Sequence, residues 1–311
     1  MPVAALRGRL DPAAALWLAG LGVVVLVLVA APMAAILYHA FVAGEGGLAA
    51  PTLANFAKVL ADPIYWTALL NTLIVSGAAA LIATALGCTL AWMLVRTNTP
   101  WRGALERVCE MPIFVPPFVG AVAWALLFAP RIGVFNRLLL ELGAAVQLDI
   151  YSLSGMTCVI GAYLAPYVML IVAAALRGMD PSLEEAAQVA GLGHVAAALR
   201  ITLPLLAPAL TSGLVLAFTI AIGLFGTPVV LGWSRQILLL TSRIWISAQA
   251  VPPDYGVMAA LSFYLVILST LAIAAQRLAL AGRSFATITG KGFRPRSIDL
   301  GPWRWAGFAA I

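Results

Sequence analysis

The feature that most constrains the fold is a set of long stretches without any charged residue. No Asp, Glu, Lys, Arg or His lies between Asp62 and Arg96, or between Arg200 and Arg235. A helix crosses the hydrocarbon core of a bilayer in about 20 residues, and a charge placed there is costly. The chain is also 63% hydrophobic and 10% charged, whereas soluble domains have about 25% charged residues. The sequence therefore predicts an all-α, polytopic membrane protein.

Six apolar segments are expected to cross the membrane. Their approximate ranges are 13–38, 67–95, 111–129, 151–176, 205–232 and 255–275, within a transmembrane domain at 13–281. Residues 1–12 precede this domain, a basic tail or linker covers 282–302, and 303–311 look like the start of a further apolar span. The first segment is far longer than the roughly 7–15 apolar residues of a signal peptide, so we favour an uncleaved span. Pro112, Pro116 and Pro117 predict a bend in the third segment.

The basic residues predict which loops face the cytoplasm. Of the 18 lysines and arginines, 13 fall at the two termini and in the second and fourth loops, and 5 fall in the other loops. Short loops rich in Lys and Arg stay in the cytoplasm. Both termini and the loop at 177–204 are therefore expected to be cytoplasmic. The net charge of +6 is then explained by membrane topology and needs no nucleic-acid partner.

Several activities have no support in the residues. His39 and His194 are isolated and Cys88, Cys109 and Cys158 show no C-x-x-C spacing, so no metal site is expected. No serine–histidine–acid cluster suggests catalysis, and no G-x-x-x-x-G-K-[ST] loop could bind ATP. The expected spans lack the carboxylates and histidines that commonly relay protons, although coupling to sodium through backbone carbonyls stays open. We expect no catalytic residue and no cofactor on this chain.

The loop at 177–204 predicts a helix, a turn and a second helix at the membrane surface. Asp180 can cap a helix that begins at the following proline. Alternatively, Ser182 and Glu185 form a capping box. Glycines in 191–193 interrupt the helix because glycine permits a reversal of the backbone. A second short helix is expected over about 194–201.

The spacing of this loop resembles a known family. Glu185-Ala186-Ala187, Gly191 and Ile201-x-Leu203-Pro204 match the EAA loop of inner-membrane permeases of binding-protein-dependent ABC importers. The resemblance implies the six-helix type I importer fold, with a cytoplasmic coupling helix on which an ATPase subunit docks. The residues that it assigns to ATPase coupling are Glu184, Glu185, Ala186, Ala187, Gly191, Ile201, Leu203 and Pro204.

Further motifs are similar to the ferric-iron subgroup of these permeases. They include Pro116-Pro117-Phe118-Val119-Gly120, Tyr163-x-x-Pro166-Tyr167 and Pro252-Pro253-Asp254-Tyr255-Gly256. The chain looks like the first half of a tandem permease of this subgroup. The resemblance implies ferric iron as the substrate, with polyamine, thiamine, phosphonate or sugar as alternatives. An ATPase-independent secondary transporter or channel remains the alternative from a different class.

The same resemblance implies the partners. They are a cytoplasmic ABC ATPase dimer that uses ATP, a periplasmic substrate-binding protein, and a second permease half or copy in a bacterial inner membrane. Polar residues inside the expected spans could line the translocation path: Asn71, Thr72, Tyr163, Tyr167 and Thr219. Alternatively, they join helices, as Ser, Thr and Asn commonly do within membranes.

Overall fold

The computed structural model describes residues 12–43, 50–144, 146–180, 182–280, 299 and 301–311. Most of the expected N-terminal segment at 1–12 and of the expected tail at 282–302 lies outside these residues. The chain divides into two compact units. One comprises Met1–Asp62 and Ile244–Tyr264, and the other comprises Pro63–Arg243 and Leu265–Ile311.

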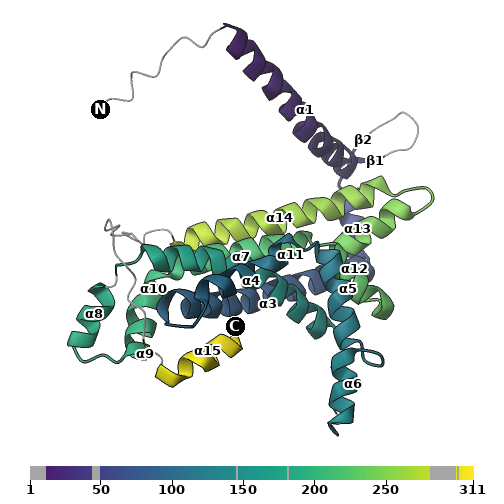
Figure 1. Cartoon of the computed structure of the whole chain (residues 1–311). Helices are drawn as coiled ribbons and strands as arrows, with labels where there is room; N and C mark the ends of the chain where they lie inside the picture. Colours follow the sequence, from purple (N-terminus) through teal and green to yellow (C-terminus); the bar gives the residue numbers. More distant parts are fainter. Residues whose placement is uncertain (1–11, 44–49, 145, 181, 281–298, 300) are drawn as a thin grey trace. The chain divides into compact units, whose positions relative to one another are not determined.

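Three long helices form the centre of the larger unit. Helices α3 (Pro63–Arg96), α7 (Leu153–Gly178) and α11 (Ala207–Gly223) lie side by side, and their apolar side chains make the buried core (Figure 1). Glycines allow close approach. A Cβ on Gly87 of α3 would meet the carbonyl oxygen of Ala165 at 2.7 Å, and one on Gly161 of α7 would meet the Ile82 side chain at 2.7 Å. Small residues at helix contacts are typical of membrane helix bundles, where close packing replaces the hydrophobic effect.

The segment expected as the third span is divided between two helices. Helix α4 (Arg102–Phe114) already begins before the expected range 111–129, and α5 (Pro117–Phe128) follows after a bend of 106°. The backbone of Val115 is extended at this bend, and the prolines at 116 and 117 have no N–H to continue the helix. The bend predicted from the prolines is confirmed, and it takes the form of a break between two helices.

The segment expected as the fifth span, 205–232, is divided as well. Helix α11 ends at Gly223, and α12 (Gly226–Gly232) and a 3-10 turn, η3 (Trp233–Arg235), follow it. Before α11, the chain bends by 60° between Ala198–Leu205 and Ala207–Gly223. Among the described residues, four helices are long and apolar enough to cross a membrane, or up to six if each bent pair counts as one span. The four are Leu16–Phe41, Pro63–Arg96, Leu153–Gly178 and Tyr255–Leu280.

The smaller unit is held by aromatic and polar contacts. Helix α1 (Pro12–Phe41) leads into a two-stranded antiparallel pair, β1 (Val42–Ala43) and β2 (Ala50–Pro51), and then into α2 (Ala54–Ala61). Helices α13 (Leu240–Gln249) and α14 (Tyr255–Leu280) divide their residues between the two units. The rings of Phe41 and Phe56 pack near Phe263 at the start of α14, with ring centroids 5.0–5.6 Å apart.

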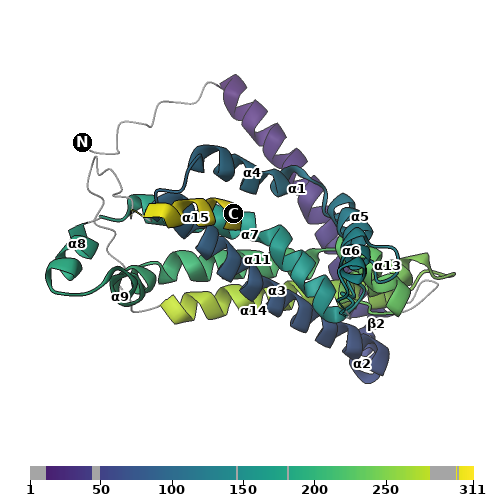
Figure 2. The same cartoon turned by 60° about the horizontal axis from the view of Figure 1, so that its bottom comes forward.

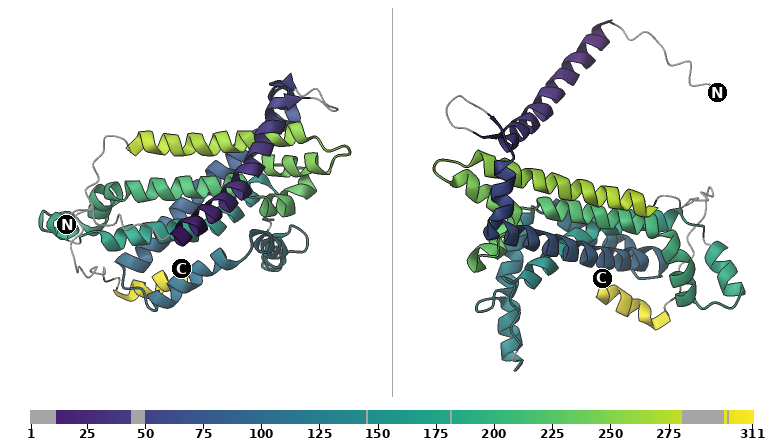
Figure 3. Two further views of the ribbon diagram at one scale, coloured as in Figure 1. Left: turned by 90° about the horizontal axis from the view of Figure 1, so that it is seen from above. Right: turned by 180° about the vertical axis from the view of Figure 1, so that it is seen from behind.

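Short helices mark the two ends of the larger unit. Helices α8 (Ser182–Val189) and α9 (His194–Ala197) lie at one end, whereas α6 (Val134–Glu141) and α12 lie at the other (Figures 1 and 3). Helix α15 (Arg304–Ala310), preceded by η4 (Gly301–Trp303), covers the segment expected to start a further span. It lies near α4 (Figures 2 and 3), and its Phe308 ring meets Trp101 edge to face at 6.0 Å.

Candidate functional site

The first half of the site is a short capped helix that ends in a glycine turn. The Asp180 carboxylate accepts a hydrogen bond of 2.9 Å from the Ser182 N–H, just before α8. At the other end Gly191 has φ +87°, a left-handed conformation that only glycine adopts without cost. The Leu192 N–H donates to the Ala187 carbonyl at 3.0 Å, which is the 6→1 hydrogen bond of a Schellman motif. The chain reversal at Gly191 is therefore set by local backbone chemistry.

The second half returns the chain to the bundle through an irregular helix. Helix α9 runs directly into a π-helical turn, η2 (Ala198–Thr202), and then into the three-residue helix α10 (Leu203–Leu205). Helix α8 contacts both α9 and η2. Ala187 and Ala197, one from each side of the turn, are buried. We call residues 182–205 the surface hairpin, since its two arms pack through small side chains.

A buried carboxylate ties the surface hairpin to α3. Oε1 of Glu184 accepts a hydrogen bond of 2.7 Å from the Thr202 hydroxyl, and it lies 3.4 Å from Nη2 of Arg96. Thr202 and Arg96 are 0% and 1% exposed, and the Glu184 side chain is 16% exposed. Three elements therefore meet at one oxygen: the last residue of α3, the first turn of α8, and η2. We call these three residues the inner junction.

A second ion pair lies at the same end of the bundle but is more exposed. Nη2 of Arg177, in the last turn of α7, lies 2.5 Å from Oε1 of Glu106 in α4. Their side chains are 48% and 25% exposed, so water screens this pair. It joins α4 to the helix that leads into the surface hairpin.

The structure places the predicted coupling residues on both faces of the hairpin. Glu184 and Ala187 face inward, whereas Ala186, Gly191, Leu203 and Pro204 are exposed and Ile201 is half-buried. Glu185 lies within α8, but its side chain is outside the described residues. The exposed side of α8 also presents Val189, which is 90% exposed. Among the side chains that the structure describes, the exposed side of α8 is therefore mostly apolar.

Two of the residues predicted to line the translocation path hydrogen-bond to the backbone of a neighbouring segment. The Asn71 amide donates to the Leu238 carbonyl at 3.3 Å, and the Thr72 hydroxyl accepts from the Leu240 N–H at 2.9 Å. Both residues thereby fasten α3 to the segment that leads into α13, in agreement with the alternative that polar residues join helices.

The remaining path candidates lie on α7 and α11. The Tyr163 hydroxyl donates to the carbonyl of Val115, at the bend between α4 and α5. Tyr167 packs against the core, and the Thr219 hydroxyl is buried without a hydrogen-bond partner. Two apolar cavities of about 250 and 330 Å³ lie along α3, and none of the five candidates lines either of them. Their role in transport stays a prediction.

Arg96 is the site residue that sequence reasoning missed. Its position after a charge-free stretch suggested a loop cation, but the structure buries it. The only available signal was its place at the end of a span, and that position does not reveal its partner, Glu184, which lies far along the chain.

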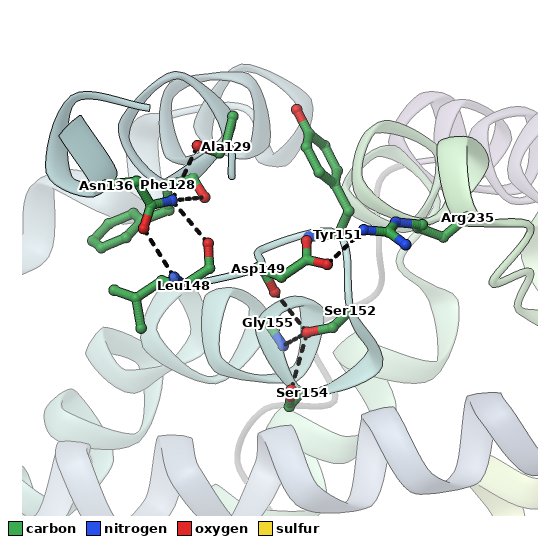
Figure 4. A network of polar contacts seen from close by, with 10 residues as sticks. All are labelled: Phe128, Ala129, Asn136, Leu148, Asp149, Tyr151, Ser152, Ser154, Gly155 and Arg235. Carbon is green, nitrogen blue, oxygen red and sulfur yellow. Dashed lines mark hydrogen bonds and ion pairs between the residues drawn. The ribbon is translucent and has the colours of Figure 1, made fainter. Parts of the chain in front are cut away.

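The opposite end of α7 carries a second polar network (Figure 4). The Asn136 amide nitrogen lies 3.1, 3.0 and 2.8 Å from the carbonyl oxygens of Phe128, Ala129 and Leu148, and its oxygen accepts from the Leu148 N–H at 2.8 Å. Ser152 caps α7 by accepting from the Gly155 N–H at 3.0 Å. Sequence reasoning did not single out these residues either. We call Asn136 with its four bonds the outer junction.

The structure is a bundle of apolar helices with the surface hairpin inserted between α7 and α11. Such an arrangement is that of a membrane subunit of a transporter. The sequence model of the binding-protein-dependent transport system inner membrane component matches residues 83–282. This match covers most of the chain, including all three central helices in whole or part and the surface hairpin. The chain belongs to this family of inner-membrane permeases of ABC importers.

The curated relatives include permeases named for different substrates. The chain is 32% identical over 171 residues to the molybdenum transport system permease protein ModB of Escherichia coli (strain K12), covering 55% of this chain and 73% of that protein. It is 28% identical over 232 residues to the ferric transport system permease protein FbpB of Actinobacillus pleuropneumoniae, covering 74% of this chain and 33% of that protein. It is 27% identical over 222 residues to the sulfate transport system permease protein CysT of Salmonella typhimurium, covering 70% of this chain and 77% of that protein.

Solved structures support the fold. A chain of a bacterial alginate ABC transporter, crystallised in complex with an alginate pentasaccharide-bound periplasmic protein, superposes with a TM-score of 0.70 at 18% identity. The superposition covers 88% of this chain and 96% of that chain. A chain of an amino acid ABC transporter gives a TM-score of 0.51 and covers 73% of this chain. The all-α permease fold expected from the EAA loop is confirmed.

Proposed function

We propose that this chain is the membrane subunit of an ATP-driven importer and that the surface hairpin receives the movement of a separate cytoplasmic ATPase dimer. The observation that carries the proposal is the hairpin itself, inserted between α7 and α11 in a chain of this family. The sequence has no ATP-binding loop of its own. The exposed side of α8, with small residues around Val189, offers a surface that a partner can approach closely.

The remaining partners follow from the same reading. A second permease half or copy would complete the path across the inner membrane, and a periplasmic binding protein would deliver the substrate. The distribution of Lys and Arg supports a cytoplasmic position for both termini and the hairpin. The alginate transporter chain that shares this fold was crystallised with a periplasmic protein, which supports that kind of partner.

Ferric iron is the substrate that we propose, on the motifs at 116–120, 163–167 and 252–256 and on the ferric relatives. Molybdate and sulfate are competing candidates, because relatives named for these anions match with similar identity. Ferric ion is a cation, whereas molybdate and sulfate are both dianions, so the uptake of each of the three is measured separately.

The test is transport by the whole complex in proteoliposomes. The chain is co-purified with the ATPase and binding protein encoded by neighbouring genes, and uptake of radiolabelled ferric ion, molybdate or sulfate is measured with and without ATP on the ATPase side. We expect uptake of one substrate that requires both ATP and the binding protein. A Gly191→Trp complex should hydrolyse ATP without matching uptake. Uptake that proceeds without ATP, driven by a sodium gradient, would overturn the proposal.

A further inference from the structure

The inner junction contains a buried guanidinium, that of Arg96, with few polar contacts. Arg96 is 1% exposed, and its Nε, Nη1 and Nη2 atoms have no hydrogen-bond partner among the described residues. The Glu184 carboxylate at 3.4 Å is its ion-pair partner. Burying a guanidinium is costly unless it is paired, so a position of this kind needs a reason beyond packing.

The geometry supplies that reason. The surface hairpin is covalently continuous with α7 at Gly178 and reaches α11 through α10. Neither connection includes α3, although α3 packs against both α7 and α11. Arg96 is the terminal residue of α3, and through Glu184 it joins this third helix to the first turn of α8. The hairpin is therefore joined to α7 and α11 at its chain ends and to α3 through the Glu184 carboxylate.

We infer that Arg96 is a positioning residue that locks α8 to α3, so that a displacement of the surface hairpin moves α3, α7 and α11 together. The inference rests on the proposed function, because the displacement is the one that the ATPase would impose. Ala198, Leu199 and Leu203 of the hairpin also line an apolar cavity together with α3, but among the described residues the Arg96–Glu184 ion pair is the polar contact that joins α8 to α3. The Glu184–Thr202 hydrogen bond lies within the hairpin itself, so without Arg96 a displacement of α8 is transmitted less directly to α3.

The long ion pair also allows the inner junction to change when α8 moves relative to α3. Charge-assisted N–H···O bonds are typically about 2.7–2.9 Å long, whereas the Arg96–Glu184 contact is 3.4 Å. A small approach of α8 to α3 would form bonds that are not made in this structure. Coupling requires an element whose position two partners can bias, and the inner junction meets this requirement.

The first test needs no partner protein. In a background with Cys88, Cys109 and Cys158 replaced by Ser, spin labels on Val189→Cys in α8 and Thr89→Cys in α3 report their distance distribution by pulsed EPR. We expect a narrow distribution in the parent and in the control Arg102→Met, which removes an exposed arginine from α4. Arg96→Met and Glu184→Gln should broaden it, and Arg96→Lys should restore it in part. An unchanged distribution in Arg96→Met would overturn the inference.

The second test measures coupling in the reconstituted complex. We expect Arg96→Met to raise the ratio of ATP hydrolysed to substrate imported by about tenfold, a typical size for coupling between sites, while the ATPase stays bound. If Arg96→Met does not fold, Arg96→Met/Glu184→Met removes both buried charges and should fold while remaining uncoupled. An unchanged ratio with the ATPase bound would overturn the inference. Failure of the wild-type complex to bind any ATPase would instead overturn the proposed function.

Discussion

The two ends of α7 carry polar junctions of opposite character. At its start, the neutral amide of Asn136 makes four hydrogen bonds with backbone groups, each 2.8–3.1 Å long. Beyond its last residue, the Glu184 carboxylate accepts one hydrogen bond from the described residues, and the guanidinium of its ion-pair partner Arg96, at 3.4 Å, makes none with them. Asn136, Arg96 and Thr202 are buried and Glu184 is half-buried, so the two junctions differ mainly in their chemistry.

This difference suggests that the outer junction is fixed and that the inner junction can change its geometry. A buried amide whose two N–H donors are already shared among three carbonyl groups has no unformed donor bond to gain from a change in geometry. A buried ion pair with unformed bonds gains or loses energy when its elements move. We therefore expect the outer junction to hold the loops around α6 in one arrangement, and the inner junction to vary with the position of the hairpin.

The largest effect is expected for Asn136→Ala, which tests whether the outer junction holds its loop in place. It removes the amide partner of the Leu148 N–H and of the Phe128 and Leu148 carbonyl groups, whereas the Ala129 carbonyl still accepts from the Gly133 N–H. Each unsatisfied buried group costs about 1–3 kcal/mol. We expect a loss of about 3 kcal/mol in the free energy of unfolding, measured by thermal unfolding in detergent. Gln147→Ala, which changes an exposed side chain in the same loop, is the matched control. A loss equal to that of the control would show that the junction does not hold the loop.

The next largest effect should come from the close contact between α3 and α7 at Gly87. A side chain at Gly87 would collide with the backbone of Ala165 and Met169 in α7, at 2.7 and 2.8 Å. Gly87→Val should therefore separate α3 from α7 and cost about 1–3 kcal/mol by overpacking. Gly77→Val in the same helix is the control, since a Cβ at this position would meet no neighbouring side chain or helix within 4 Å. Equal melting temperatures for the two variants would contradict the close approach.

A substitution at Gly191 should have a smaller effect, confined to the surface hairpin. Gly191→Val forces a β-branched residue into φ +87°, which costs about 1–2 kcal/mol, whereas Asn tolerates this region better. We expect hydrogen exchange at the Leu192 amide to accelerate about tenfold in Gly191→Val, since 1.4 kcal/mol is a factor of ten. Gly191→Asn should have less effect, and Gly193→Val, at a glycine without positive φ, should have little. Unaltered exchange in Gly191→Val would argue against the turn.

The smallest effect is expected for an exposed ion pair that belongs to neither junction. Burial raises the pKa of Asp254, but hydrogen bonds from Lys58 and the Val257 N–H, with the Lys58 charge, together hold it below its ordinary value. A lowered carboxyl pKa stabilises the fold above the ordinary value of about 3.9, and this stabilisation is lost as pH falls through the folded-state pKa.

Because both side chains of this pair are more than a third exposed, Asp254→Asn should cost less than about 1 kcal/mol at pH 7. The difference between variant and parent should vanish as the pH of the unfolding assay is lowered through the folded-state pKa, where Asp254 becomes neutral. A difference that persists in acid would mean that the carboxylate charge is not its source.

The sequence predicts the parts of this molecule that depend on local chemistry. Glycine at 191 indicated the turn, Asp180 indicated the start of α8, and the prolines after Val115 indicated a bend, because each acts on its own backbone. The inner and outer junctions depend on contacts between residues distant in the chain. Nothing at Arg96 or Asn136 reveals a partner, and only the folded arrangement brings Glu184 or Leu148 to them.

The most direct test of the account is to ask which end of the larger unit touches the ATPase. A photo-crosslinking amino acid is placed at Val189 on α8, or at Leu140 on α6, which are 90% and 73% exposed, and the complex is irradiated in native membranes. The account predicts an adduct with the ATPase from Val189 and none from Leu140. An adduct from Leu140, or none from Val189 while the ATPase co-purifies with the chain, would contradict it.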